Sequence, residues 1–137
     1  MKDIRSALRQ FLLDDPTVSG LVNGDRIYPI RLPQNEVRAS VVYFAVSETG
    51  DYHMQGDSGL GQTRMQVDAW AERTDQAVEL ANAVYDRLSG ARATVAVGSD
   101  FVDIKGIFLA NKRDLYDPIV KMTGVSRDYI IWYGASE

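Results

Sequence analysis

The stretch from Gln62 to Leu88 constrains the fold more than any other, because the spacing of its apolar residues changes partway along it. From Thr63 to Trp70 the side chains fall into two alternating sets. One set is Thr63, Met65, Val67 and Ala69, and the other is Arg64, Gln66, Asp68 and Trp70. An alternation of period two is typical of a β-strand with one buried face. The sequence therefore predicts such a strand over residues 63–70.

After this strand the apolar residues recur at the spacing of an α-helix. They are Ala77, Leu80, Ala81, Val84, Tyr85 and Leu88. Thr74 and Asp75 stand where an N-cap and an acidic first turn belong, and Gly90 stands where a helix ends. A strand that leads into a capped amphipathic helix is typical of an α+β domain in which a helix packs on a sheet.

The length of 137 residues and the apolar fraction of 45% are those of one globular domain, which we expect to span residues 1–137. The net charge of −4 disfavours a general binder of nucleic acid or of anionic membranes, because such proteins carry a basic surplus. The absence of cysteine excludes disulfides, thiol catalysis and thiolate metal sites. We expect no signal peptide and no membrane span, since no apolar run approaches roughly 20 residues.

Shorter patterns predict the remaining elements. A first helix is expected from Lys2 to Leu13, followed by a short helical turn that starts at Pro16 with Asp15 as its cap. Strands are expected at residues 26–28, 40–49, 101–110 and 125–133, with a weaker one at 94–97. The predicted fold is α+β, with two helices packed on one face of a mostly antiparallel sheet of four to six strands.

The segment from Gly50 to Gly61 contains four glycines and mostly polar residues, so we expect a long, mobile hairpin loop of functional importance. Within it, Gly56-Asp57-Ser58-Gly59 resembles the nucleophile motif of trypsin-like serine proteases. A catalytic serine needs a histidine base and an aspartate that orients the base. The only histidine in the chain is His53, in the same segment, whereas the protease family carries its histidine on a distant element. A polar, glycine-rich loop is therefore the favoured interpretation.

No cofactor is expected. A single histidine cannot build a histidine-based metal site, and Glu48, Asp51 and Asp57 lack the spacing of a calcium loop. The glycines of residues 56–61 are not followed by the Lys-Ser/Thr pair of a P-loop.

The densest charged segment is Arg113-Asp114-Leu115-Tyr116-Asp117, at the predicted end of a strand before Pro118. Its two carboxylates would permit acid–base chemistry, but a salt-bridged turn explains them equally well. Because Arg and Tyr are enriched at protein interfaces, we favour an interface here. Trp70 and Trp132 are expected on the second face of the sheet, which would need a partner chain if no helix covers it.

In their order and spacing, these segments resemble the tail-terminator, or tail-completion, proteins of long-tailed bacteriophages, which join the tail to the head. The resemblance covers nearly the whole chain, and no single motif carries it. The matching segments are Asp15-Pro16-Thr17-Val18, Arg26-Ile27-Tyr28-Pro29, Leu32-Pro33-Gln34, Val41-Val42-Tyr43, Gln66-Val67-Asp68-Ala69-Trp70-Ala71, the helix of residues 77–88, residues 113–117 and Ile130-Ile131-Trp132-Tyr133.

The resemblance implies a structural subunit and not an enzyme. It implies a ring of identical copies, a homohexamer, on the head-proximal end of the tail tube. This ring would stop polymerisation of the tail tube protein and offer a docking face to the head-completion or connector protein. DNA would pass through the ring without specific binding. The expected location is the tail-head junction of the virion, and the host cytoplasm during assembly.

A ring needs two different, complementary patches on each subunit. We expect them in the Gly50–Gly61 loop and in residues 113–117. The candidate interface residues are Asp51, Tyr52, His53, Asp57, Arg113, Asp114, Tyr116 and Asp117. Two alternatives stay open: another neck or tail component, such as a tail tube subunit or a head-completion protein, and a small serine hydrolase that uses Ser58.

Overall fold

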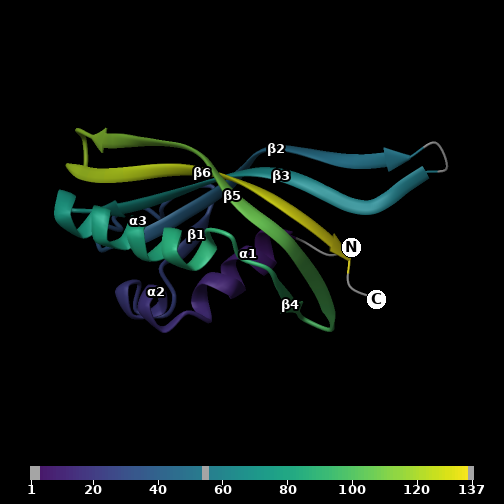
Figure 1. Cartoon of the computed structure of the whole chain (residues 1–137). Helices are drawn as coiled ribbons and strands as arrows, with labels where there is room; N and C mark the ends of the chain where they lie inside the picture. Colours follow the sequence, from purple (N-terminus) through teal and green to yellow (C-terminus); the bar gives the residue numbers. More distant parts are fainter. Residues whose placement is uncertain (1–3, 54–55, 136–137) are drawn as a thin grey trace.

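The computed structural model describes residues 4–53 and 56–135, without the side chains of residues 48–53, 56–60, 100 and 135. Within these residues the chain forms three helices and six strands (Figure 1). In chain order they are α1 (Ile4–Leu13), α2 (Pro16–Leu21), β1 (Ile27–Pro29), β2 (Ser40–His53), β3 (Gly56–Ala71), α3 (Thr74–Leu88), β4 (Ala93–Val97), β5 (Asp100–Asp117) and β6 (Met122–Ala135).

The strands form one curled sheet in the order β1-β2-β3-β6-β5-β4, and the described helices lie together on one of its faces (Figure 1). β1 pairs parallel with β2, whereas all the other neighbours are antiparallel. The predicted α+β class and mostly antiparallel sheet are confirmed, but three helices, not two, cover the face. The third is α2, which we expected as a single turn. The Asp15 side chain accepts a hydrogen bond from the Val18 N–H (3.1 Å), and the helix continues through Gly20.

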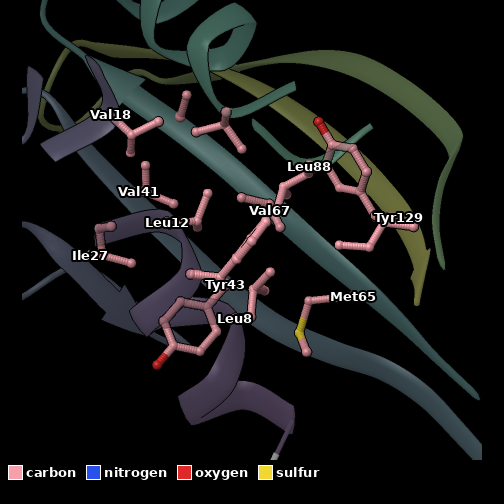
Figure 2. Close-up of a cluster of buried hydrophobic side chains, with 14 of the residues drawn as sticks. Leu8, Leu12, Val18, Ile27, Val41, Tyr43, Met65, Val67, Leu88 and Tyr129 are labelled. Atoms are coloured by element: carbon pink, nitrogen blue, oxygen red, sulfur yellow. The ribbon is translucent and has the colours of Figure 1, made fainter. Parts of the chain in front are cut away.

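The core lies between the helices and the face of the sheet that they cover, which we call the helix face. The alternation in β3 has its predicted effect: Thr63, Met65, Val67 and Ala69 are all buried there. In Figure 2, Met65 and Val67 lie among side chains from α1 and β2, and Leu88 of α3 lies near Tyr129 of β6. The opposite face, which we call the open face, has no described helix on it.

The start of α3 differs from the prediction by one residue. The N-cap is Arg73, which has an extended backbone and makes no side-chain cap hydrogen bond; Thr74 is already helical. The guanidinium of Arg73 instead holds the carboxylate of Asp75 in the first turn, at 2.7 Å. The predicted end is confirmed, since Gly90 adopts a φ of +71° just beyond the helix and its N–H donates to the Ile107 carbonyl (2.9 Å).

Arginine side chains join the layers by donating to backbone carbonyls of neighbouring elements. Such a bond can satisfy a carbonyl that would otherwise lack a partner, as at Phe11 in the last turn of α1. The bonds link Arg9 to Ile27 (3.0 Å), Arg87 to Phe11 (2.9 Å) and Arg127 to Ala81 (2.8 Å).

The prediction of a long loop from Gly50 to Gly61 is wrong, because most of this segment belongs to β2 and β3. The two strands pair as Gly50 with Gly61, Tyr52 with Asp57 and His53 with Gly56. The pairing of the two strands is irregular between Gly50 and Tyr52, where the register shifts. Glycine in a strand often marks such a bulge. The ladder between β3 and β6 runs from Leu60 paired with Gly134 to Ala71 paired with Thr123. Beyond Leu60 the hairpin has two strands and extends away from the body (Figure 1).

Candidate assembly surfaces

The part of the chain that the structure describes offers no metal centre. No group of three or more His, Asp or Glu side chains comes together there. The described helices are too short or too polar to cross a membrane. The two residues of the protease-like motif, Ser58 and His53, lie in β3 and at the end of β2, but their side chains are outside the described residues.

The predicted interface residues fall into two groups at opposite ends of the sheet (Figure 1). Asp51, Tyr52, His53 and Asp57 belong to the free end of the β2–β3 hairpin, and their side chains are outside the described residues. The other four, at positions 113, 114, 116 and 117, belong to the last part of β5. The fold thus separates the two groups.

The segment from Arg113 to Asp117 is strand, not the salt-bridged turn that the sequence left open. Arg113 pairs across the ladder with Ser126 and Asp117 with Met122, so the turn itself comes after Asp117. Asp117 stabilises that turn, because its Oδ1 accepts a hydrogen bond from the Ile119 N–H at 3.0 Å. The strand runs longer than predicted because the pairing with β6 continues past a register shift between Leu109 and Asn111.

The turn between β5 and β6 presents apolar side chains to solvent. We call residues 116–121 the hairpin tip. Ile119 is 89% exposed, Tyr116 59% and Val120 47%. Sequence reasoning noted Tyr116 but missed Ile119 and Val120. The signal was the dipeptide Ile-Val directly after Pro118, since a turn places such residues on the surface.

The open face carries a network of charged and polar side chains that the sequence analysis did not predict. Arg64 Nη2 lies 3.0 Å from Asp128 Oδ2, and Arg113 Nη1 lies 3.6 Å from the other carboxylate oxygen. Arg113 Nη2 also donates to Gln66 Oε1 at 2.7 Å. The side chain of Asp128 is only 7% exposed although no described helix covers this face. Arg113 is thus held within its own chain, which makes it a less independent contact residue than expected.

Asp68 lies beside this network and is also buried. Burial raises the pKa of its carboxyl group, against the neighbouring Ser126 hydroxyl, a hydrogen bond from Gln66 and the charge of Arg113, which lower it. The alternation in β3 placed Arg64, Gln66 and Asp68 on one face, but the partners from β5 and β6 follow only from the strand order.

Aromatic side chains flank the network. Trp70 is half-buried on the open face, and its ring lies over Gly124, where an added Cβ would come within 2.9 Å of the ring. Trp132 is also half-buried, and Phe108 is 56% exposed. The expectation that both tryptophans lie partly buried on the second face is confirmed.

Comparison with known proteins gives one family and two solved structures with a similar fold. The family model of Tail completion protein gp17 matches residues 6–134. A chain from the virion of a native gene transfer agent (GTA) particle superposes with a TM-score of 0.69 at 15% identity, covering 96% of this chain and 95% of that chain. A second solved structure has a TM-score of 0.58 at 11% identity, covering 98% of this chain and 94% of that chain. No curated protein matches the sequence.

At these identities the two solved structures show a shared fold alone. The family match does more, because residues 6–134 include both hairpins, α2, α3, most of α1 and nearly the whole sheet. It confirms the resemblance on which the sequence analysis relied. The chain therefore belongs to the family of Tail completion protein gp17, whose members are structural proteins of phage tail assembly.

Proposed function

We propose that the protein forms a ring, a homohexamer, on the head-proximal end of a phage tail tube. The ring stops polymerisation of the tail tube protein and offers the surface to which the head-completion or connector protein binds. The observation that carries this proposal is the match to a tail completion family over residues 6–134. The likeness to a chain of a gene transfer agent virion supports a place in the particle.

The fold suits a head-to-tail ring. Such a ring needs two unlike patches that lie apart on each subunit. The β2–β3 hairpin and the hairpin tip stand at opposite ends of the sheet (Figure 1), so separate surfaces are available for a neighbouring subunit and for the tube. A hairpin of two strands is at best marginally stable alone in water, so the part beyond Leu60 gains most from a neighbour or from the tube. DNA passes through the ring without specific binding, in keeping with the net charge of −4.

The test is negative-stain microscopy of the purified protein mixed with the tail tube protein encoded nearby. Rings at one end of the tubes, with further growth blocked, are the expected result. Tubes that keep growing with no protein at either end would contradict termination and favour another neck component. Filaments formed by this protein alone would identify it as a tube subunit.

Tyr116 is the best single residue for testing the contact at the end of β5. Its side chain is 59% exposed, so replacing it with Ala should leave the free energy of unfolding nearly unchanged. We expect the Tyr116→Ala variant to cap fewer tube ends at equal concentration. Phe101, which is 49% exposed on the same strand at its other end, provides the matched control Phe101→Ala. Equal capping by the two variants would show that this end of β5 is not a contact.

The hydrolase alternative gains no support from the family match. Its test is the Ser58→Ala variant, which would lose all activity if Ser58 were a nucleophile and should cap tubes like the parent protein.

A further inference from the structure

We propose that the hairpin tip of one copy docks in a cleft between α2 and α3 of a second copy. This contact is the subunit interface of the ring, so the inference rests on the proposed function. The α2–α3 cleft is a hollow of about 330 Å³ lined by Leu21, Arg26, Val37, Arg38, Ala39, Glu72, Gln76, Glu79 and Leu80.

The tip has the form of a preformed apolar knob. Its turn is fixed from within, because Asp117 Oδ1 accepts hydrogen bonds from the N–H groups of Ile119 (3.0 Å) and Val120 (3.5 Å). Little conformational entropy remains to be lost when such a turn docks. Ile119, at 89% exposure, is the most exposed large apolar residue among those described. A side chain of that kind gains free energy when a partner removes it from water.

The cleft has the complementary form. Leu21, Val37 and Leu80 supply apolar lining from α2, from the loop before β2 and from α3. At about 30 Å³ per water molecule, its volume corresponds to on the order of ten waters. Apolar side chains that enter would displace these waters and bury the lining residues at the same time.

Charge supplies the argument for a second copy as the occupant. Glu72 and Glu79 border the cleft together with Arg26 and Arg38, and Lys121 ends the tip. Both arginines are engaged within their own chain: Arg38 pairs with Glu36, and Arg26 donates to the Ala39 and Leu21 carbonyls. Among the described residues, neither glutamate takes part in an ion pair, and nor does Lys121. With Ile119 and Val120 in the cleft, the adjacent Lys121 comes next to these carboxylates. The carboxylates of Glu72 and Glu79 are therefore opposite in charge to Lys121, and the apolar part of the cleft, formed by Leu21, Val37 and Leu80, is available to Ile119 and Val120.

The contact is head-to-tail, because the tip of one chain uses the cleft of another and leaves its own cleft free. Repetition of such a contact in one direction gives a ring or a chain of copies, whereas two copies that exchange tips would form a closed pair; the proposed ring requires the first arrangement.

Disulfide trapping tests the contact directly, because the parent chain has no cysteine and gives no background. The double variant Ile119→Cys/Val37→Cys places one thiol on the tip and one on the cleft. A disulfide forms only if the two Cα atoms approach within about 7 Å. The protein is oxidised alone and on tail tubes, and the products are separated by size without reductant. We expect a ladder of cross-linked species beyond the dimer.

The controls are the single variants and the pair Ile119→Cys/Arg92→Cys, since Arg92 is exposed but outside the cleft. Each single variant can give at most a dimer, and the control pair should give no ladder. If sedimentation or microscopy shows rings while the test pair cross-links no better than the control pair, the contact is wrong and the ring stands. If the parent protein forms no ring, alone or on tubes, the proposed function fails first.

A charge exchange serves as a second, independent test. Lys121→Glu and Glu79→Lys should each raise the concentration needed for assembly at least about tenfold, because each puts like charges together. The double variant restores an opposite pair and should assemble nearly like the parent. A double variant no better than the single ones would overturn the contact.

Discussion

Gly124 shows how closely single residues are fitted on the open face. The ring of Trp70 lies over it, and an added Cβ would come within 2.9 Å of that ring. We expect Gly124→Ala to lower the free energy of unfolding by about 1–3 kcal/mol, because the ring or the strand must shift to make room. Urea denaturation followed by tryptophan fluorescence measures both the stability and the displacement of Trp70.

Gly20 in α2 provides the control, since an added Cβ there meets nothing within 4 Å. Gly20→Ala should be neutral or stabilising by up to about 1 kcal/mol, because alanine favours a helix over glycine. Equal stability of the Gly124 and Gly20 variants would show that Trp70 does not depend on the glycine beneath it.

Arg127 and Arg73 should contribute differently to the free energy of unfolding. Arg127 donates to the Ala81 carbonyl (2.8 Å) and to Asn82 Oδ1 (2.9 Å), so it ties α3 to β6 in a partly buried setting. We expect Arg127→Met to cost about 1.5–3 kcal/mol in unfolding free energy. Arg73 pairs with Asp75 in a site where both side chains are more than 60% exposed, so Arg73→Met should cost under about 1 kcal/mol. Thermal unfolding of the two variants decides, and equal losses would contradict this ranking.

At the residue scale, the sequence could indicate which side chains share a face within one strand. It could not indicate which residues meet across strands. Arg64 and Asp128 lie 64 residues apart in the sequence, nearly half the chain length. Their ion pair depends on the adjacency of β3 and β6, which no local pattern encodes. Most of the open-face network was therefore beyond prediction, although each strand's contribution to it was visible.

At the scale of elements, the loop between β1 and β2 is held by a single carboxylate. Glu36 accepts hydrogen bonds from the Tyr28 hydroxyl (2.9 Å) and from Arg38 Nε (3.0 Å). The Arg38 guanidinium, together with the Tyr28 hydroxyl, lowers the pKa of Glu36 from 4.5 to about 2. This loop also contributes Val37 to the α2–α3 cleft.

The pH dependence of stability follows from that shift. Because the folded pKa lies below the unfolded one, the contribution of Glu36 is fully present above about pH 4.5 and declines as the pH falls toward 2. The difference in unfolding free energy between the parent and Glu36→Gln should therefore shrink over this range. Urea denaturation at pH 6, 4 and 3 measures it. A difference that stays constant or grows on acidification would contradict the assigned hydrogen bonds.

Elements with a strong period could be predicted from the sequence, and those set by pairing could not. β3 and α3 lie on either side of the point where the spacing of apolar residues changes, as predicted. β6 covers the predicted residues 125–133. The hairpin of β2 and β3 was mistaken for a loop because glycine and polar residues weigh against a strand locally. The pairing of β2 with β3 starts in the apolar part of both strands. It continues through the glycine-rich residues as far as the pair of His53 with Gly56, despite their composition.

At the scale of the whole molecule, the β2–β3 hairpin is the part with least support. Residues 50–53 and 56–59 have a partner strand on one side only, whereas residues 61–70 of β3 pair with β2 on one side and with β6 on the other. We expect amide hydrogens in the first two segments to exchange faster with solvent than those of residues 63–70 in the free protein. They should become protected when the protein sits on tail tubes.

Hydrogen exchange followed by mass spectrometry measures both states. Residues 125–131 of β6 are the internal control, since their exchange should not change on tubes. Full protection of the hairpin in the free protein, or none on tubes, would show that it is not a contact element.

The ladder between β3 and β6 has a consequence for the order of events during synthesis. It joins the hairpin near the middle of the chain to the last strand, with Leu60 beside Gly134. The sheet therefore stays in two parts, β1-β2-β3 and β5-β4, until β6 is available to join them. Contacts so distant in sequence make folding slow, because a long loop must close before they form. A chain that stops before β6 lacks the strand that joins the two parts of the sheet, so we expect it not to assemble.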